Sequence, residues 1–102
     1  MVVSRPFFAY MLECGDGSFY VGHTDNLATR VSQHQAGIGS QWTASRLPVR
    51  LVWSQEFGAR EEAKETERQL KGWSRAKKVA LMRGELDLLR VLSSRARGAR
   101  AD

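Results

Sequence analysis

The chain has 102 residues and a mass of 11.5 kDa, with 42% apolar, 26% charged and 9% aromatic residues, which is typical of one globular domain. The longest uncharged apolar run, residues 6–12, is far shorter than the roughly 20 residues of a membrane-spanning helix, and no secretory leader is recognisable. The single cysteine, Cys14, excludes an internal disulfide, and we expect a cytoplasmic protein. The net charge is +5, and residues 68–83 hold six basic residues and no acidic one.

The first predicted element is a β-hairpin. Residues 7–13 and 18–23 are rich in aromatic and β-branched residues and are separated by Cys-Gly-Asp-Gly. The first run is apolar at both alternating sets of positions, which is typical of a central strand covered on both faces. Two closures of the turn remain open. A three-residue loop, 15–17, places Tyr10 and Tyr20 diagonally on one face, whereas a two-residue turn places them on opposite faces.

The next predicted element is a helix over residues 26–36. Asp25 is a suitable N-cap, and Gly37 is a suitable residue to follow the last turn. At about 100° per residue, Arg30 and His34 fall one turn apart at the edge of the apolar stripe of this helix.

The rest of the chain alternates a strand with helices. A Gly- and Ser-rich loop, residues 37–46, leads to a third predicted strand over 49–57. Helices are predicted over 59–72 and 74–83, and a short helix or turn over 85–92. We expect a single domain over residues 1–92, followed by a flexible basic tail, 93–102.

Glu67 occupies an unusual position for a carboxylate. It lies on the same predicted helical face as Ala63 and Leu70, which is the face drawn toward the core. Burial of an unpaired charge costs several kcal/mol, so Glu67 needs a cationic partner. Arg30, a lysine or a metal ion could supply it. The sequence leaves open whether Arg30 and Glu67 form a structural salt bridge or a functional pair that faces a cleft.

Two short segments resemble the motifs of the GIY-YIG nuclease superfamily. Phe8-Ala9-Tyr10 keeps only the tyrosine of the first motif, whereas Tyr20-Val21-Gly22 differs from the second only by valine for isoleucine. The resemblance covers about residues 7–82 and is strongest to small, stand-alone bacterial members. The further matching positions are Thr24, Asp25, Asn26, Leu27, Arg30, His34, Gly37, Thr43, Pro48, Leu51, Val52, Glu67, Leu70, Lys71, Lys77 and Lys78.

The resemblance implies an α+β fold in which helices flank a three-stranded antiparallel sheet, with the active site across the first two strands. It also implies phosphodiester hydrolysis with one divalent ion, Mg²⁺ or Mn²⁺, held by Glu67. The catalytic residues that it implies are Tyr10, Tyr20, His23, Arg30, His34 and Glu67.

These residue types suit the chemistry of phosphodiester hydrolysis. Arg30 can bind two phosphate oxygens through its planar guanidinium group. Tyr20 is the candidate to accept the proton of the attacking water, which requires surroundings that lower its pKa from the ordinary value of about 10. We expect Tyr10 to orient the water or the phosphate by hydrogen bonding.

The sequence therefore predicts a metal-dependent endonuclease that acts on DNA. We expect phosphate contacts from a basic segment, defined as Arg68, Lys71, Arg75, Lys77 and Lys78. Alternatives are a non-catalytic nucleic-acid-binding module with the same fold, and an adaptor whose positive face meets an acidic protein. The retained set of Tyr20, Arg30 and Glu67 favours the enzyme. We expect no membrane association and no obligate protein partner.

Overall fold

The computed structural model describes residues 5–91. The chain divides into two compact units, residues 1–71 and 72–102, and each is described by itself. The predicted tail, residues 93–102, lies outside the described residues. Within residues 5–91, no helix is long and apolar enough to cross a membrane.

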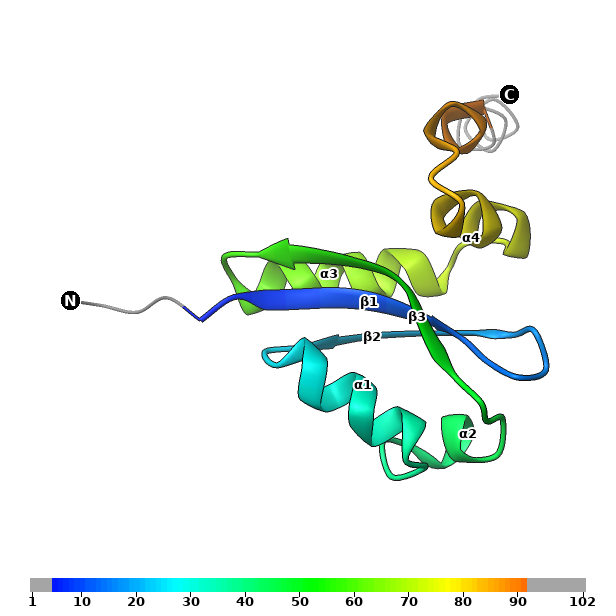
Figure 1. The fold of residues 1–102 in the computed structure, drawn as a ribbon. Helices are drawn as coiled ribbons and strands as arrows, with labels where there is room; N and C mark the ends of the chain where they lie inside the picture. Colours follow the sequence, from blue (N-terminus) through cyan, green and yellow to red (C-terminus); the bar gives the residue numbers. More distant parts are fainter. Residues whose placement is uncertain (1–4, 92–102) are drawn as a thin grey trace. The chain divides into compact units, whose positions relative to one another are not determined.

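The first unit is built on an antiparallel sheet of three strands in the order β2-β1-β3 (Figure 1). The strands are β1 (Phe7–Glu13), β2 (Phe19–Thr24) and β3 (Arg50–Phe57). The four central residues of β1, residues 9–12, are at most 1% exposed. This confirms the predicted three-stranded sheet and the prediction of a central strand covered on both faces.

The hairpin between β1 and β2 closes through a three-residue loop. The backbone N–H of Cys14 donates to the carbonyl of Ser18 at 2.8 Å, and Gly17 adopts a φ of 84° that favours glycine. The resulting register places Tyr10 and Tyr20 diagonally on one face, with ring centroids 6.3 Å apart. Of the two closures left open by the sequence, the structure therefore has the first.

Helix α1 (Leu27–Gln35) begins one residue later than predicted. Oδ1 of Asn26 accepts a hydrogen bond from the backbone N–H of Thr29 at 3.2 Å, so Asn26 is the N-cap and the prediction of Asp25 was wrong. Asp25 instead lies 3.4 Å from Arg5. Gly37 follows the helix with a φ of 80°, as predicted.

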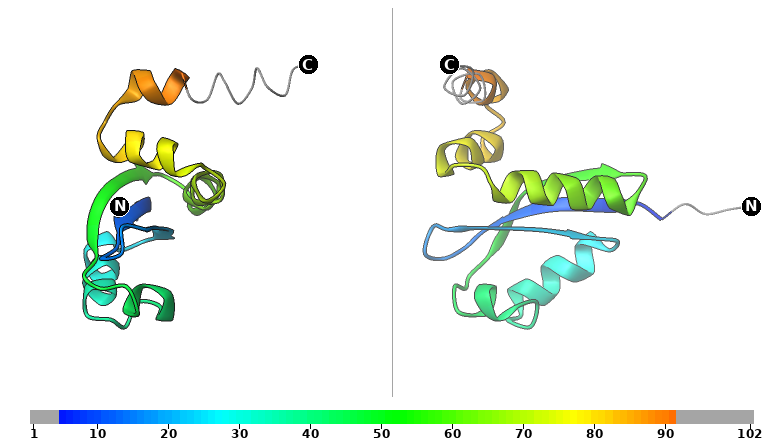
Figure 2. Two further views of the ribbon diagram at one scale, coloured as in Figure 1. Left: turned by 90° about the vertical axis from the view of Figure 1, so that its right-hand side faces the viewer. Right: turned by 180° about the vertical axis from the view of Figure 1, so that it is seen from behind.

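A one-turn helix, α2 (Gln41–Ala44), interrupts the segment predicted as a loop. Oγ of Ser40 accepts from the backbone N–H of Thr43 at 3.1 Å and closes this turn. The third helix, α3 (Arg60–Lys71), agrees with its prediction to within one residue at each end. Helices α1 and α2 lie on one side of the sheet and α3 lies on the other, and the view from behind in Figure 2 shows the same layers.

The two sides of the sheet bury different groups. A core of Tyr10, Leu12, Cys14 and Val49 packs with Tyr20, Leu27 and Val31 on the side of α1. Because successive side chains of a strand point to opposite faces, His23 of β2 lies on the side of α3. Ala63 and Leu70 of α3 are 0% and 3% exposed, as their predicted helical face requires.

The second unit contains helix α4 (Arg75–Met82), which agrees with the helix predicted over 74–83. Oγ of Ser74 caps its N-terminus by accepting from the backbone N–H of Lys77 at 3.3 Å. Residues 86–91 are also helical.

Candidate functional site

The candidate site is centred on Tyr10 of β1, whose side chain lies against Gly22 of the neighbouring edge strand β2. A Cβ atom at Gly22 would lie 2.6 Å from the hydroxyl oxygen of Tyr10 and 2.7 Å from its Cζ, so a glycine is required beneath the ring. Tyr10 is 1% exposed. Burial raises its pKa to about 12, against a smaller opposing effect of Arg30, so Tyr10 is a neutral phenol at neutral pH.

A buried chain of hydrogen bonds leads from Tyr10 to α2. The hydroxyl of Tyr10 lies 3.0 Å from Nε2 of His34, and Nδ1 of His34 lies 2.9 Å from Oγ1 of Thr43. His34 and Thr43 are both 0% exposed. Burial, assisted by the positive charge of Arg30, lowers the pKa of His34, so its imidazole is neutral at neutral pH. His34 is thus a buried link between the sheet and α2.

Arg30 of α1 joins the two tyrosines. Its Nη1 donates to Oε1 of Gln33 at 3.2 Å. A hydrogen bond to the hydroxyl of Tyr10, together with weaker interactions with Tyr20, raises the pKa of Arg30. The guanidinium therefore acts electrostatically on both motif tyrosines from the α1 side of the sheet.

Glu67 has two partners on the other side of the sheet. Its Oε1 accepts from Nδ1 of His23 at 3.0 Å, and its Oε2 lies 3.2 Å from Nζ of Lys71. Burial opposes ionisation of Glu67, but these two interactions outweigh it and hold the pKa below its ordinary range. The carboxylate, with 20% of the side chain exposed, is therefore ionised at neutral pH.

Glu67 has a cationic partner, as expected from the sequence. That partner is not Arg30, so the Arg30–Glu67 salt bridge considered from the sequence is not the one that the structure has. Arg30 extends from α1 and engages the tyrosines, whereas Glu67 extends from α3 and engages His23 and Lys71. The charges of both groups nevertheless act on the pKa of Tyr10, Arg30 lowering it and Glu67 weakly raising it.

The scaffold that carries these residues matches a known family. Residues 6–80 match the GIY-YIG catalytic domain. The chain belongs to the GIY-YIG family. A UPF0213 protein of Lacticaseibacillus paracasei is 42% identical over 81 residues, which are 79% of this chain and 91% of that protein. A UPF0213 protein of Natronomonas pharaonis is 40% identical over 83 residues, which are 81% of this chain and 98% of that one.

A solved structure agrees with the fold. A protein from E. faecalis, determined by solution NMR, superposes with a TM-score of 0.51 at 32% sequence identity. The match covers 76% of this chain and 83% of the other. The membership makes this chain part of a nuclease family, while the names of these relatives state no specific activity.

Glu67 is the candidate metal ligand of this GIY-YIG domain. In residues 5–91, no group of three or more His, Cys, Asp or Glu side chains is arranged to hold a metal ion. Mg²⁺ commonly binds through one or two carboxylates and keeps several waters, so a single ionised carboxylate can be enough to hold it. Glu67 fits an ion that takes most of its ligands from water and substrate.

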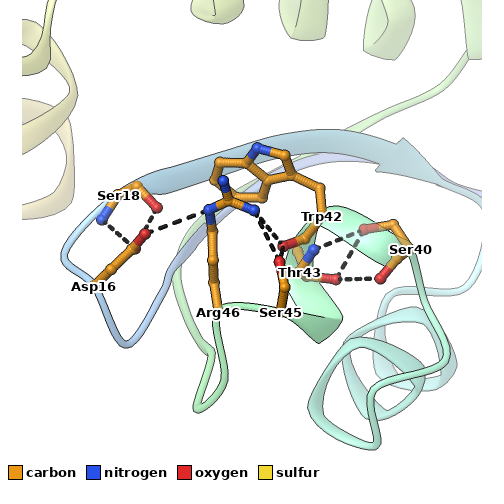
Figure 3. A network of polar contacts seen from close by, with 7 residues as sticks. All are labelled: Asp16, Ser18, Ser40, Trp42, Thr43, Ser45 and Arg46. Carbon is orange, nitrogen blue, oxygen red and sulfur yellow. Dashed lines mark hydrogen bonds and ion pairs between the residues drawn. The ribbon is translucent and has the colours of Figure 1, made fainter.

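A second polar network joins α2 and the residues after it to the hairpin loop (Figure 3). The guanidinium of Arg46 stacks 4.0 Å from the ring centroid of Trp42, and its Nε lies 3.3 Å from Oδ2 of Asp16. The ring of Trp42 lies 5.9 Å from that of Tyr20. Arg46 thereby connects the α2 segment to the tip of the hairpin.

The basic segment is divided between the two units. Arg68 and Lys71 belong to α3, whereas Arg75, Lys77 and Lys78 belong to α4. Arg68 lies 3.2 Å from Glu65, and Lys71 is held by Glu67. Nζ of Lys77 lies 5.7 Å from the ring centroid of Trp73.

Sequence reasoning missed the roles of Ser40, Thr43 and Arg46. Ser40 is a residue type that commonly caps the start of a helix, and this signal could have predicted the one-turn helix. No local pattern indicates that Thr43 contacts His34 or that Arg46 contacts Asp16, since both contacts depend on how separate segments meet.

Proposed function

We propose that this GIY-YIG protein is a divalent-metal-dependent endonuclease that hydrolyses phosphodiester bonds in DNA. The main support is a set of groups centred on Tyr10, whose ring lies against Gly22: the guanidinium of Arg30, the phenol of Tyr20 and the ionised carboxylate of Glu67 all act on it electrostatically. Phosphodiester hydrolysis requires positive charge for the phosphate oxygens, a group to position water and a carboxylate to hold a cation.

Each residue of the set has a role in this proposal. Arg30 binds two oxygens of the scissile phosphate and offsets the negative charge that develops on them. Tyr10, held neutral by burial, orients the attacking water by hydrogen bonding. Tyr20 accepts the proton of that water as the general base. His23 and Lys71 hold the carboxylate of Glu67 in an ionised, oriented state.

Glu67 would hold Mg²⁺ or Mn²⁺ together with water and phosphate oxygens. The ion, when bound, supplies a Lewis acid that stabilises charge on the leaving oxygen. Lys71, with 57% of its side chain exposed, can release Oε2 of Glu67 at little cost and pair with the substrate backbone instead.

The nucleic acid would be bound mainly through its phosphates. The proposed contacts come from the basic segment: Arg68 and Lys71 lie in α3, and Arg75, Lys77 and Lys78 lie in α4. No acidic residue stands between residues 68 and 83. Contacts of this kind position the substrate but discriminate little among sequences.

One observation favours a second candidate, a non-catalytic nucleic-acid-binding module. Both carboxylate oxygens of Glu67 are already paired, with His23 and with Lys71. A carboxylate satisfied in this way has a structural explanation that requires no metal ion. Cleavage and binding must therefore be measured separately.

The test is nicking of supercoiled plasmid, and cleavage of branched and single-stranded DNA, with Mg²⁺, with Mn²⁺ and with a chelator. We expect cleavage that requires the ion and is abolished by Glu67→Gln and by Tyr20→Phe. Glu61→Gln is the matched control, since Glu61 is on the same helix with 84% of its side chain exposed. DNA binding by the wild type without ion-dependent cleavage would support the binding module instead.

A further inference from the structure

Thr43 is a buried polar residue beside the site to which the proposed reaction gives no role. Its Oγ1 lies 2.9 Å from Nδ1 of His34, 2.8 Å from Oγ of Ser40 and 3.3 Å from the Ser40 carbonyl. Figure 3 shows Thr43 and Ser40 joined by these contacts at the start of α2. Gly39 allows the close approach, since a Cβ there would lie 2.5 Å from Nδ1 of His34.

The proton positions in this chain can be assigned by counting donors and acceptors. Arg30, whose charge acts on Tyr10, carries only donors and therefore cannot take the proton of the Tyr10 hydroxyl. Among the contacts of Tyr10 within residues 5–91, Nε2 of His34 at 3.0 Å is the one that can accept this proton. Nε2 is therefore the unprotonated nitrogen of His34.

The position of the one proton on the His34 ring follows from its neutral charge. A neutral imidazole carries one proton, and with Nε2 bare that proton is on Nδ1. Nδ1–H then donates to Oγ1 of Thr43, and the hydroxyl of Thr43 donates onward to Ser40. Every buried group of the chain has a partner in this assignment, in agreement with the absence of unpaired buried side-chain N or O atoms in residues 5–91.

We propose that Thr43 is a positioning residue: by accepting from Nδ1–H of His34, it holds the tautomer whose bare Nε2 directs the hydroxyl proton of Tyr10 away from the substrate. This inference rests on the proposed nuclease function. The oxygen of Tyr10 then presents only lone pairs to the reacting water, so the water donates to Tyr10 and keeps its own lone pair for the phosphate. In the other tautomer, with the His34 proton on Nε2, the Tyr10 hydroxyl donates to the water. That hydrogen bond occupies the lone pair of the water that must attack the phosphorus.

The first test measures the tautomer directly. Long-range ¹H–¹⁵N NMR of the imidazole rings distinguishes protonated from bare nitrogens, and the chain has two histidines, so His23→Gln assigns the signals. We expect wild-type His34 to carry its proton on Nδ1 at neutral pH. We expect Thr43→Val, which keeps the shape but removes the acceptor, to populate the Nε2–H form, and Thr43→Ser to restore the wild-type spectrum.

The second test measures cleavage by the same variants. Thr43→Val should lower kcat about tenfold or more with little change in KM, by analogy with the hydrogen-bond partners that orient metal-binding histidines, whose loss has effects of this size. Thr43→Ser should recover most of the rate. Thr29→Val is the matched control, since Thr29 is exposed on the helix that carries His34.

Two results would overturn the proposal: a wild-type His34 protonated on Nε2, or a Thr43→Val variant with unchanged tautomer and kcat. The wild-type spectrum shows which nitrogen of His34 is protonated even if the Thr43→Val variant does not fold. Absence of cleavage by the wild type would refute the proposed function alone, because the NMR measurement still decides what Thr43 does to His34.

Discussion

Oε1 of Glu67 on α3 lies 3.0 Å from Nδ1 of His23 on β2, and this hydrogen bond joins residues 44 positions apart. It ties α3 to the edge strand and keeps the carboxylate ionised at the point where β2 passes beneath the ring of Tyr10. In the proposed function, this hydrogen bond would orient the candidate ligand for a cation. A cation bound to Glu67 would then displace the exposed side chain of Lys71.

Glu67→Gln should change stability by less than about 1 kcal/mol. The amide oxygen of glutamine can still accept from Nδ1 of His23, and the lost pair with Lys71 is an exposed i,i+4 pair of small value. Urea denaturation of wild type, Glu67→Gln and the control Glu61→Gln measures this. A loss of about 3–5 kcal/mol would instead indicate a stranded buried charge.

Gly22→Ala should disrupt both the fold and the site. The new methyl group meets the ring of Tyr10 at 2.6–2.7 Å, so the ring must move, at a cost of about 1–3 kcal/mol. Gly58→Ala is the control, because an added Cβ there meets nothing within 4 Å. Melting temperatures of the two variants should differ clearly, and equal values would show that Tyr10 moves aside freely.

Tyr10 should ionise only in strongly alkaline solution. The chain has two tyrosines, so Tyr20→Phe leaves Tyr10 as the remaining phenol, with a pKa raised by burial to about 12. The native state holds this proton more tightly than the unfolded state, whose pKa is about 10, so stability falls as the pH rises from about 10 toward 12. Ultraviolet titration of phenolate should show this. Ionisation near pH 10 in the folded variant would contradict the burial argument.

His34 should make stability fall on mild acidification. Burial and the charge of Arg30 lower its pKa in the native state, so below about pH 6.5 the unfolded chain takes up a proton that the native chain does not. The effect is absent above the unfolded pKa and grows as the pH falls toward the native one. Urea denaturation at pH 7.5 and 5.5 should show a larger loss for wild type than for His34→Gln.

Reversal of charge in α4 should weaken nucleic-acid binding. Lys77→Glu with Lys78→Glu removes two proposed phosphate contacts, so the affinity for DNA and the slope of its dependence on salt should both decrease. Lys64→Glu with Arg90→Glu makes the same change of net charge outside residues 68–83. Fluorescence anisotropy over a range of salt concentrations measures both pairs. Equal losses of DNA affinity in the two double variants would indicate that binding responds to net charge alone.

Much of the architecture follows from local patterns in the sequence. The apolar character of residues 7–13 specifies a central strand, and the face shared by Glu67, Ala63 and Leu70 places a carboxylate at the edge of the core. Such patterns are readable because strand and helix periodicities, turn glycines and capping residues act over a few neighbouring residues. The one-residue error at Asp25 and Asn26 reflects two adjacent side chains that are both able to cap a helix.

The partners within the site were decided only by the tertiary structure. The sequence identified Glu67 and His34 as polar residues near apolar faces, but not that His23 binds the first or that Thr43 binds the second. The choice of hairpin closure, on which the common face of Tyr10 and Tyr20 depends, also stayed open until the register was known. These contacts join separate strands, helices and loops, and their geometry is set by how those elements pack. No local periodicity encodes it, because several partners of suitable chemistry satisfy the same local pattern.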